Sequence, residues 1–182
     1  MVTTEWFRLS KADDNNSLKA SAEFSRAQYP YFIDKTAFAA IDDNTILYNH
    51  TGWAKYDDFI FEPTFLLGER FHPLFELLQP DMEFKSVRFF DARQKENAPA
   101  PLYYVPYLPT TEIIHPSSDV VMGKAHRLVL RQEVLARDEL KDERVLHAVL
   151  PADDIWLFSL EAAECILRRS PMGIKLTQVD MK

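Results

Sequence analysis

The sequence is poor in glycine and contains one cysteine, and both shortages limit what the protein can do. The four glycines, Gly52, Gly68, Gly123 and Gly173, are too far apart in the sequence to form a G-x-G turn or a phosphate-binding loop. Because Cys165 is the only cysteine, an internal disulfide framework and a zinc site made of thiolates are both excluded. We therefore expect no cofactor.

Long apolar runs and an excess of positive charge are also missing. No stretch approaches the roughly 20 apolar residues that a membrane-spanning helix needs, and residues 1–6 do not resemble a secretory signal. The 21 lysine and arginine residues are outnumbered by 28 aspartate and glutamate residues, for a formal net charge of −7. Because phosphate contacts call for a basic face, this balance disfavours direct nucleic-acid binding. We expect a cytoplasmic protein that does not bind membranes, and homo-oligomer formation stays open.

The sequence contains enough hydrophobic residues to form a hydrophobic core. The chain has 182 residues, of which 47% are hydrophobic and 13% are aromatic. We predict a single α+β domain over residues 1–182, with a mixed or mostly antiparallel sheet and a few helices. Residues 1–80 could form a distinct N-terminal subregion, ahead of a more regular region at 84–180.

The last 30 residues carry the most regular pattern. Residues 154–158 are β-branched and aromatic, which is typical of a strand. Ser159 follows in the position of an N-cap, and the apolar residues of 160–167 then repeat at helical spacing. Gly173 precedes a last apolar segment at 174–179. The pattern predicts a C-terminal strand–helix–strand unit.

Three other segments have a readable pattern. Residues 71–78 have a helical tendency and are stopped by Pro80. Residues 102–105 are strand-like, but Pro106 and Pro109 predict that this strand is short and lies at a sheet edge. Residues 125–135 contain three consecutive apolar residues flanked by arginines, and we interpret them as a further strand.

Residues suited to catalysis or metal binding show no recognisable spacing. None of the five histidines lies three or four residues from another, so no helical metal pair exists. No G-x-S-x-G motif is present, and adjacent aspartates on a strand would face opposite sides of a sheet. We expect no metal site and no catalytic residue.

One segment, residues 48–62, combines aromatic anchors with carboxylates. Aromatic side chains are enriched at interface centres, and neighbouring carboxylates would complement a basic partner. The alternative is that the aromatics belong to the core and the acids face solvent. Under the interface hypothesis, reversing the charge of the two aspartates should slow association and leave folding nearly untouched. The predicted partner-binding residues are Tyr48, Trp53, Tyr56, Asp57, Asp58 and Glu62.

The C-terminal part of the chain also resembles a known family. A charged stretch at 136–140 is followed by an apolar segment at 145–150, a strand ending in Ser159, a short helix, and Gly173 opening the last strand. The segment 84–87 and the pair Ser117–Ser118 fall roughly where that family has a strand and a serine-containing turn. Over residues 84–180 the chain resembles bacterial immunity protein family eleven, long catalogued as a domain of unknown function, whose members are encoded beside polymorphic toxins.

The resemblance implies a non-enzymatic protein that binds and neutralises a cognate toxin or effector, of the kind delivered between competing bacteria, for example by type VI secretion. A basic nuclease is one candidate for that partner, which an acidic inhibitor could meet at its substrate groove. The resemblance carries over no catalytic residue. Two alternatives remain: a small cytosolic hydrolase or transferase with dispersed Asp, Glu and His around His50 or His147, and a scaffolding or regulatory subunit.

Overall fold

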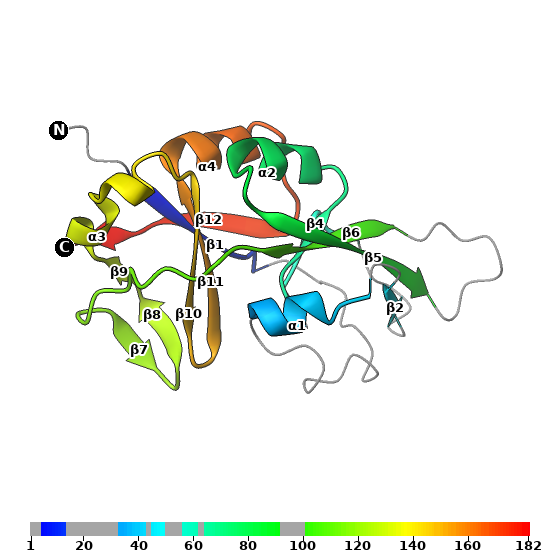
Figure 1. Cartoon of the computed structure of the whole chain (residues 1–182), viewed down its shortest axis with the longest axis horizontal. Coiled ribbons are helices and arrows are strands. Elements are labelled where there is room, and N and C mark those ends of the chain that lie inside the picture. Colours follow the sequence, from blue (N-terminus) through cyan, green and yellow to red (C-terminus); the bar gives the residue numbers. More distant parts are fainter. Residues whose placement is uncertain (1–4, 14–32, 43–44, 50–55, 62–63, 92–100) are drawn as a thin grey trace. The chain divides into compact units, whose positions relative to one another are not determined.

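The protein has an α+β fold with mostly antiparallel sheets (Figure 1), which confirms the predicted fold class. The computed structural model describes residues 5–13, 33–42, 45–49, 56–61, 64–91 and 101–182, and for 45–49 and 89–91 it describes the backbone alone. The chain divides into two compact units that interleave in sequence. Unit 1 comprises residues 1–10, 108–170 and 175–182, and unit 2 comprises residues 11–107 and 171–174. The single domain with subregions 1–80 and 84–180 stays a prediction, because compactness alone does not establish which parts fold independently.

Unit 1 is built on a four-stranded sheet with the strand order β10-β11-β1-β12. A separate hairpin, β7–β8, and a short parallel pair, β9 with β13, complete its strands. The elements are β1 (Trp6–Lys11), β7 (Asp119–Val121), β8 (Lys124–Arg127), β9 (Val129–Leu130), α3 (Gln132–Leu135), the 3-10 turn η1 (Asp138–Leu140), β10 (Val145–Leu150), β11 (Asp153–Ser159), α4 (Leu160–Leu167), β12 (Ile174–Gln178) and β13 (Asp180–Met181).

The predicted strand–helix–strand unit is confirmed as β11, α4 and β12. β11 is the inner strand between β10 and β1 and pairs antiparallel with both, which explains why residues 155–159 are all buried. Ser159 ends the strand, and its side chain accepts a hydrogen bond from the backbone N–H of Ala162, as an N-cap does. Ala162, Ala163 and Ile166 form the buried face of the helix.

Unit 2 contains a five-stranded sheet with the order β2-β5-β6-β4-β3, in which β2 and β5 are parallel. One of its core clusters joins Val87, Tyr103 and Val105 of the sheet with Phe38 of α1. Phe59 is fully buried and its ring packs 4.8 Å from the Phe71 ring, at the start of α2. The elements are α1 (Lys35–Ala39), β2 (Thr45–Asn49), β3 (Phe59–Ile60), β4 (Leu66–Gly68), α2 (His72–Leu78), β5 (Glu83–Asp91) and β6 (Leu102–Tyr107).

The prediction that residues 102–105 form an edge strand is wrong. β6 extends to Tyr107 and is the middle strand of its sheet, between β5 and β4. Pro106 is tolerated there because β4 pairs with Tyr103 and Tyr104 alone, so the proline lies beyond the part of β6 that has strands on both sides. Pro106 therefore lies where β6 is paired with β5 alone, and it does not mark β6 as an edge strand.

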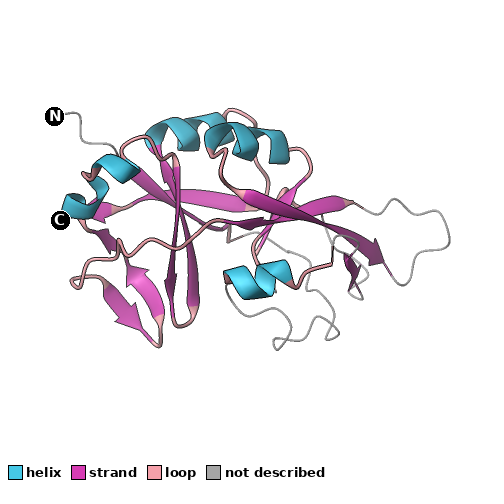
Figure 2. Ribbon diagram, in the orientation of Figure 1, coloured by secondary structure: helices cyan, strands magenta, loops and turns pink. Residues whose placement is uncertain are grey.

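The prediction of one strand over residues 125–135 is also wrong. Figure 2 shows the segment as short strands followed by a helix, and these are β8, β9 and α3. β9 is two residues long and pairs with β13 near the end of the chain. Val134 of α3 is buried in the unit 1 core, so the apolar residues after β9 pack against the core from a helix and not from a strand.

Candidate protein-binding surface

The structure describes half of the predicted interface residues. Trp53 and Glu62 lie outside the described residues, and so does the side chain of Tyr48. Tyr56 is partly buried and packs against the unit 2 core. Asp57 and Asp58 are 2% and 9% exposed, so neither carboxylate lies on a face that a partner could meet. The expectation that these two aspartates form an acidic docking surface is wrong.

The Asp58 carboxylate is satisfied by three hydrogen bonds from two groups of its own unit. Arg70 donates from Nε to Oδ1 over 3.1 Å and from a terminal nitrogen to Oδ2 over 2.7 Å, which makes a two-pronged ion pair. The backbone N–H of Met172 donates to Oδ2 over 2.8 Å. Sequence reasoning missed this role because Met172 lies 114 positions away along the chain.

The backbone around Asp58 is as closely packed as its side chain. Gly68 donates its N–H to the Asp58 carbonyl oxygen over 2.7 Å. A Cβ atom at residue 68 would lie 2.9 Å from that oxygen, so the close approach requires glycine. The main chain of Asp58 therefore joins the segment before β3 to β4, and its side chain joins that segment to the turn after β4 and to Met172.

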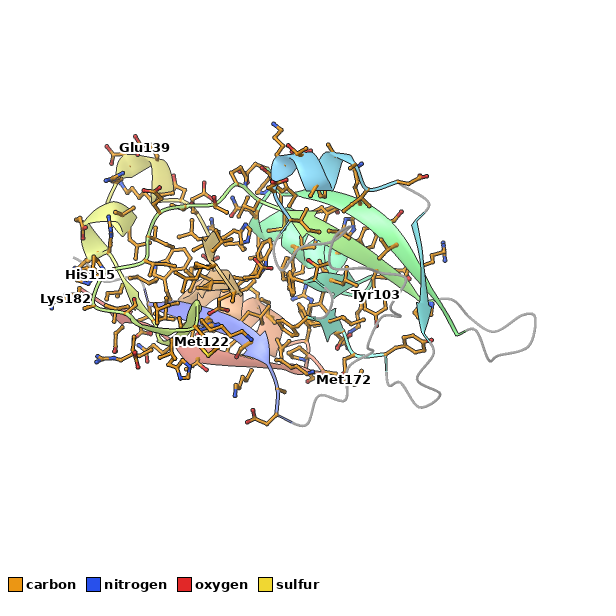
Figure 3. All side chains as sticks on the ribbon, turned by 90° about the horizontal axis from the view of Figure 1, so that it is seen from below. Tyr103, His115, Met122, Glu139, Met172 and Lys182 are labelled. Atoms are coloured by element: carbon orange, nitrogen blue, oxygen red, sulfur yellow. The ribbon has the colours of Figure 1, made fainter. Side chains whose placement is uncertain are left out.

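Tyr103 of β6, labelled in Figure 3, is 3% exposed. Its hydroxyl donates to the backbone carbonyl of Asp57 over 2.6 Å. Burial raises the pKa of the Tyr103 hydroxyl well above its ordinary value, and the negative charges of Asp58 and Asp57 add to the effect. The phenol is therefore a hydrogen-bond donor within the core.

His147, which the enzyme hypothesis used as a possible base, is 2% exposed and has a partner at each ring nitrogen. Nδ1 lies 2.9 Å from the Leu108 carbonyl oxygen, which can only accept, so Nδ1 carries a proton. Nε2 lies 2.6 Å from the Asp154 carboxylate, whose other oxygen accepts from the Trp156 indole. Nε2 thus joins β10 to β11 and Nδ1 joins β10 to the segment that follows β6, so both nitrogens are engaged in contacts within the protein.

A second histidine lies at a more accessible place in unit 2. The His72 ring stacks on the Tyr104 ring at 3.8 Å and meets the edge of Phe84 at 4.5 Å. Its Nε2 is 3.7 Å from Glu76, one helical turn along α2. Partial burial raises the pKa of Tyr104, helped by Glu69 and Glu76 and opposed by Arg88. Sequence reasoning did not find this cluster, because its members come from three separate elements, α2, β5 and β6.

Three consecutive exposed apolar side chains of unit 1 lie on the β7–β8 hairpin. Val120 is 41% exposed and Val121 46% exposed, and Met122, at the turn and labelled in Figure 3, is 92% exposed. Consecutive exposed apolar residues are uncommon on a folded surface unless something binds there. Sequence reasoning did not predict this hairpin, because its turn is Met122–Gly123 and not the usual Asn-Gly or Asp-Gly.

The hairpin is tied to the turn between β10 and β11, and Figure 1 shows the two tips side by side. The Gly123 carbonyl accepts from the N–H of Ala152 over 3.0 Å. Gly123 has a φ of +78°, and a Cβ there would approach Ala152 N and the Pro151 side chain to 3.1 Å. Glycine is therefore required at this turn both for its backbone conformation and for the contact.

An ion pair between Arg8 and Asp153 is hydrogen-bonded to the backbone of β8. Arg8 of β1 donates to both oxygens of Asp153, over 2.7 and 2.9 Å, and also to the Ala125 carbonyl over 3.0 Å. Asp153 in turn accepts from the Ala125 N–H over 2.9 Å. The backbone of Ala125 is thus bound at both its polar groups, and the hairpin is held in one orientation on unit 1.

The base of the hairpin is closed by a reciprocal pair of hydrogen bonds. The Ser118 hydroxyl donates to the Val129 carbonyl over 3.1 Å and accepts from the Val129 N–H over 3.0 Å. Ser118 precedes β7 and Val129 begins β9, so the two ends of the hairpin are joined just outside it. Turn, middle and base are all anchored, and the apolar tip is presented by a rigid support.

No model of a known protein family matches this chain, and no curated protein matches it either. Within the ranges that the structure describes, no group of three or more His, Cys, Asp or Glu side chains could hold a metal ion. The described helices are all too short or too polar to span a bilayer.

Proposed function

We propose that this protein is an immunity protein, which binds a toxin encoded beside it and blocks that toxin in the cytoplasm of the producing cell without catalysing a reaction. The observation that carries the proposal is the anchored hairpin. It presents Val120, Val121 and Met122 to solvent on a support that is hydrogen-bonded to the rest of unit 1 at its turn and along β8. A rigid apolar surface of this kind is suited to protein binding, because little conformational entropy is lost when a partner covers it.

The identity of the partner as a toxin is supported by the resemblance to immunity protein family eleven. That resemblance spans residues 84–180, which include the whole of the hairpin. The role of His147 and Asp154 in joining two strands also supports a protein without chemistry at that centre. The net charge of −7 suits a basic partner at long range, although Asp57 and Asp58, being buried, do not contribute a docking face.

Co-expression tests this proposal directly. The product of the adjacent gene, expressed alone, should arrest growth, and co-expression of this chain should restore it. The two purified proteins should form a complex that survives gel filtration. If the adjacent product is harmless and does not bind, the proposal is wrong.

The enzyme hypothesis has one observation in its favour, the stack of His72 on Tyr104 with Glu76 nearby. A hydrolase or transferase using this cluster would lose turnover of a small substrate in His72→Asn and Tyr104→Phe variants whose unfolding midpoints are unchanged. Such a loss would contradict the immunity proposal. The proposal itself predicts that both variants still protect against the toxin.

A further inference from the structure

Met122 occupies a backbone position to which methionine is poorly suited. Its φ is +52°, in the left-handed region that non-glycine residues avoid, and Gly123 follows with a φ of +78°. A two-residue turn with positive φ at both positions favours Asn-Gly or Asp-Gly. At 92% exposure the methionine side chain gains no burial in return for this strain. Strained residues of this kind are concentrated at functional sites, where a partner supplies the missing contacts.

The hairpin has an inward face and an outward face. Val120 is paired with Ala125, and Ala125 packs against the unit 1 core, so this pair forms the inward face. Val121 is paired with Lys124, and successive residues of a strand point to opposite faces, so this pair forms the outward face. Val121, Met122 and Lys124, which we call the finger, therefore form one continuous exposed surface.

Lys124 gives the finger a definite charge. Arg127, further along β8, is neutralised by an ion pair with Asp180 at 2.7 Å. Lys124 is exposed and has no ion-pair partner among the residues that the structure describes. The finger is thus an apolar tip beside a cation, on a chain whose net charge is −7. A partner surface complementary to the finger is an apolar pocket with a carboxylate on its rim.

We propose that the finger enters an apolar pocket of the toxin, where Val121 and Met122 are buried and Lys124 pairs with an acidic residue on the rim. This inference rests on the proposed function and adds the contact surface and the partner chemistry. It predicts an acidic group beside the blocked site of a partner whose overall charge is basic. The anchors at Gly123, Ala125 and Ser118 hold the finger in its binding geometry before the partner arrives.

The substitution Met122→Asn separates binding from folding. It creates the Asn-Gly turn that this backbone prefers, so the unfolding midpoint should stay the same or rise. Removal of a central apolar anchor should weaken binding to the purified product of the adjacent gene about tenfold or more, mainly through faster dissociation. Leu77→Asn is the matched control, because Leu77 is 76% exposed on α2 and is not part of the finger, so its substitution should leave affinity unchanged.

The substitution Lys124→Glu tests the charge of the rim. It should slow association with the same protein, and the slowing should diminish as salt is added. Lys141→Glu is the control, because the substitution makes the same change in net charge. Lys141 is also exposed in unit 1 and lies outside the hairpin. If both variants change the association rate equally, net charge is responsible and the acidic rim is wrong.

The outcomes distinguish the finger from the function on which it rests. If the unaltered chain binds the toxin and Met122→Asn binds as tightly, the finger is wrong and the proposed function stands. If the unaltered chain does not bind, both are wrong. If the chain alone is a dimer in sedimentation and Met122→Asn is a monomer, the finger covers a second copy of this chain, and the proposal of a toxin pocket is overturned.

Discussion

At the scale of single residues, one buried and one partly buried carboxylate act as internal cross-links. Asp58 joins Arg70 and the backbone of Met172, and Asp154 joins His147 and Trp156. Asp58 connects residues 12 and 114 positions away along the chain, and Asp154 connects the paired strands β11 and β10. In both cases hydrogen-bond donors compensate the carboxylate for the water it loses. These residues look like catalytic or docking groups in the sequence, and their burial gives them a different task.

Asp58→Ala should therefore destabilise the protein by about 2 kcal/mol, which lowers the midpoint of urea unfolding. The cost stays below that of a fully buried ion pair because the Arg70 side chain is 53% exposed and regains water. Asp142→Ala, at an exposed position, is the control and should change the midpoint little. Equal, small effects in both variants would mean that Asp58 does not hold unit 2 together.

Tyr103 predicts how stability changes at alkaline pH. The folded state keeps this phenol protonated above its ordinary pKa of 10.0, while in the unfolded state it ionises near that value. Its contribution is thus fully present below pH 10 and is lost as the pH rises further. Tyr103→Phe should cost about 1 kcal/mol at pH 8, through loss of the bond to Asp57.

The test is chemical denaturation from pH 8 to pH 11. The free energy of unfolding should fall more steeply for the unaltered protein than for Tyr103→Phe. Parallel curves would show that Tyr103 ionises equally in the folded and unfolded states, contrary to its burial.

At the scale of elements, the parts that follow local rules are the ones that sequence reasoning reached. Ser159 caps α4 through a contact with Ala162, three residues away, and the apolar spacing of the helix is visible in any short window. The position of β6 in the middle of its sheet depends on β4, some 35 residues earlier in the sequence, and no local pattern reports it. For the same reason the burial of Asp58 by Met172, and the hairpin held by Asp153, could not be predicted.

The cap of α4 gives a prediction at this scale. Ser159→Ala removes the hydroxyl that accepts from Ala162 and should cost about 1 kcal/mol in the free energy of unfolding. Ser159→Gly should cost only a few tenths of that amount, because glycine also serves as an N-cap. Thermal unfolding of both variants measures the difference. Equal losses would show that space at this buried position, and not the cap, is what matters.

At the scale of the whole molecule, the proposed function is inhibition by occupation of the partner. Under this proposal the net charge of −7 favours encounter with a basic protein, and the finger supplies the local contact. Nothing in this sequence of events consumes the protein or modifies the toxin. A binder of this kind inhibits in proportion to its amount, whereas an enzyme acts in far smaller amounts and with time.

The most direct test is a titration of the purified toxin's activity with increasing amounts of this protein. The account predicts inhibition that rises linearly, is complete at a fixed whole-number molar ratio and does not change with incubation time. Progressive loss of toxin activity at a small fraction of that ratio, or full activity at every ratio, would contradict it.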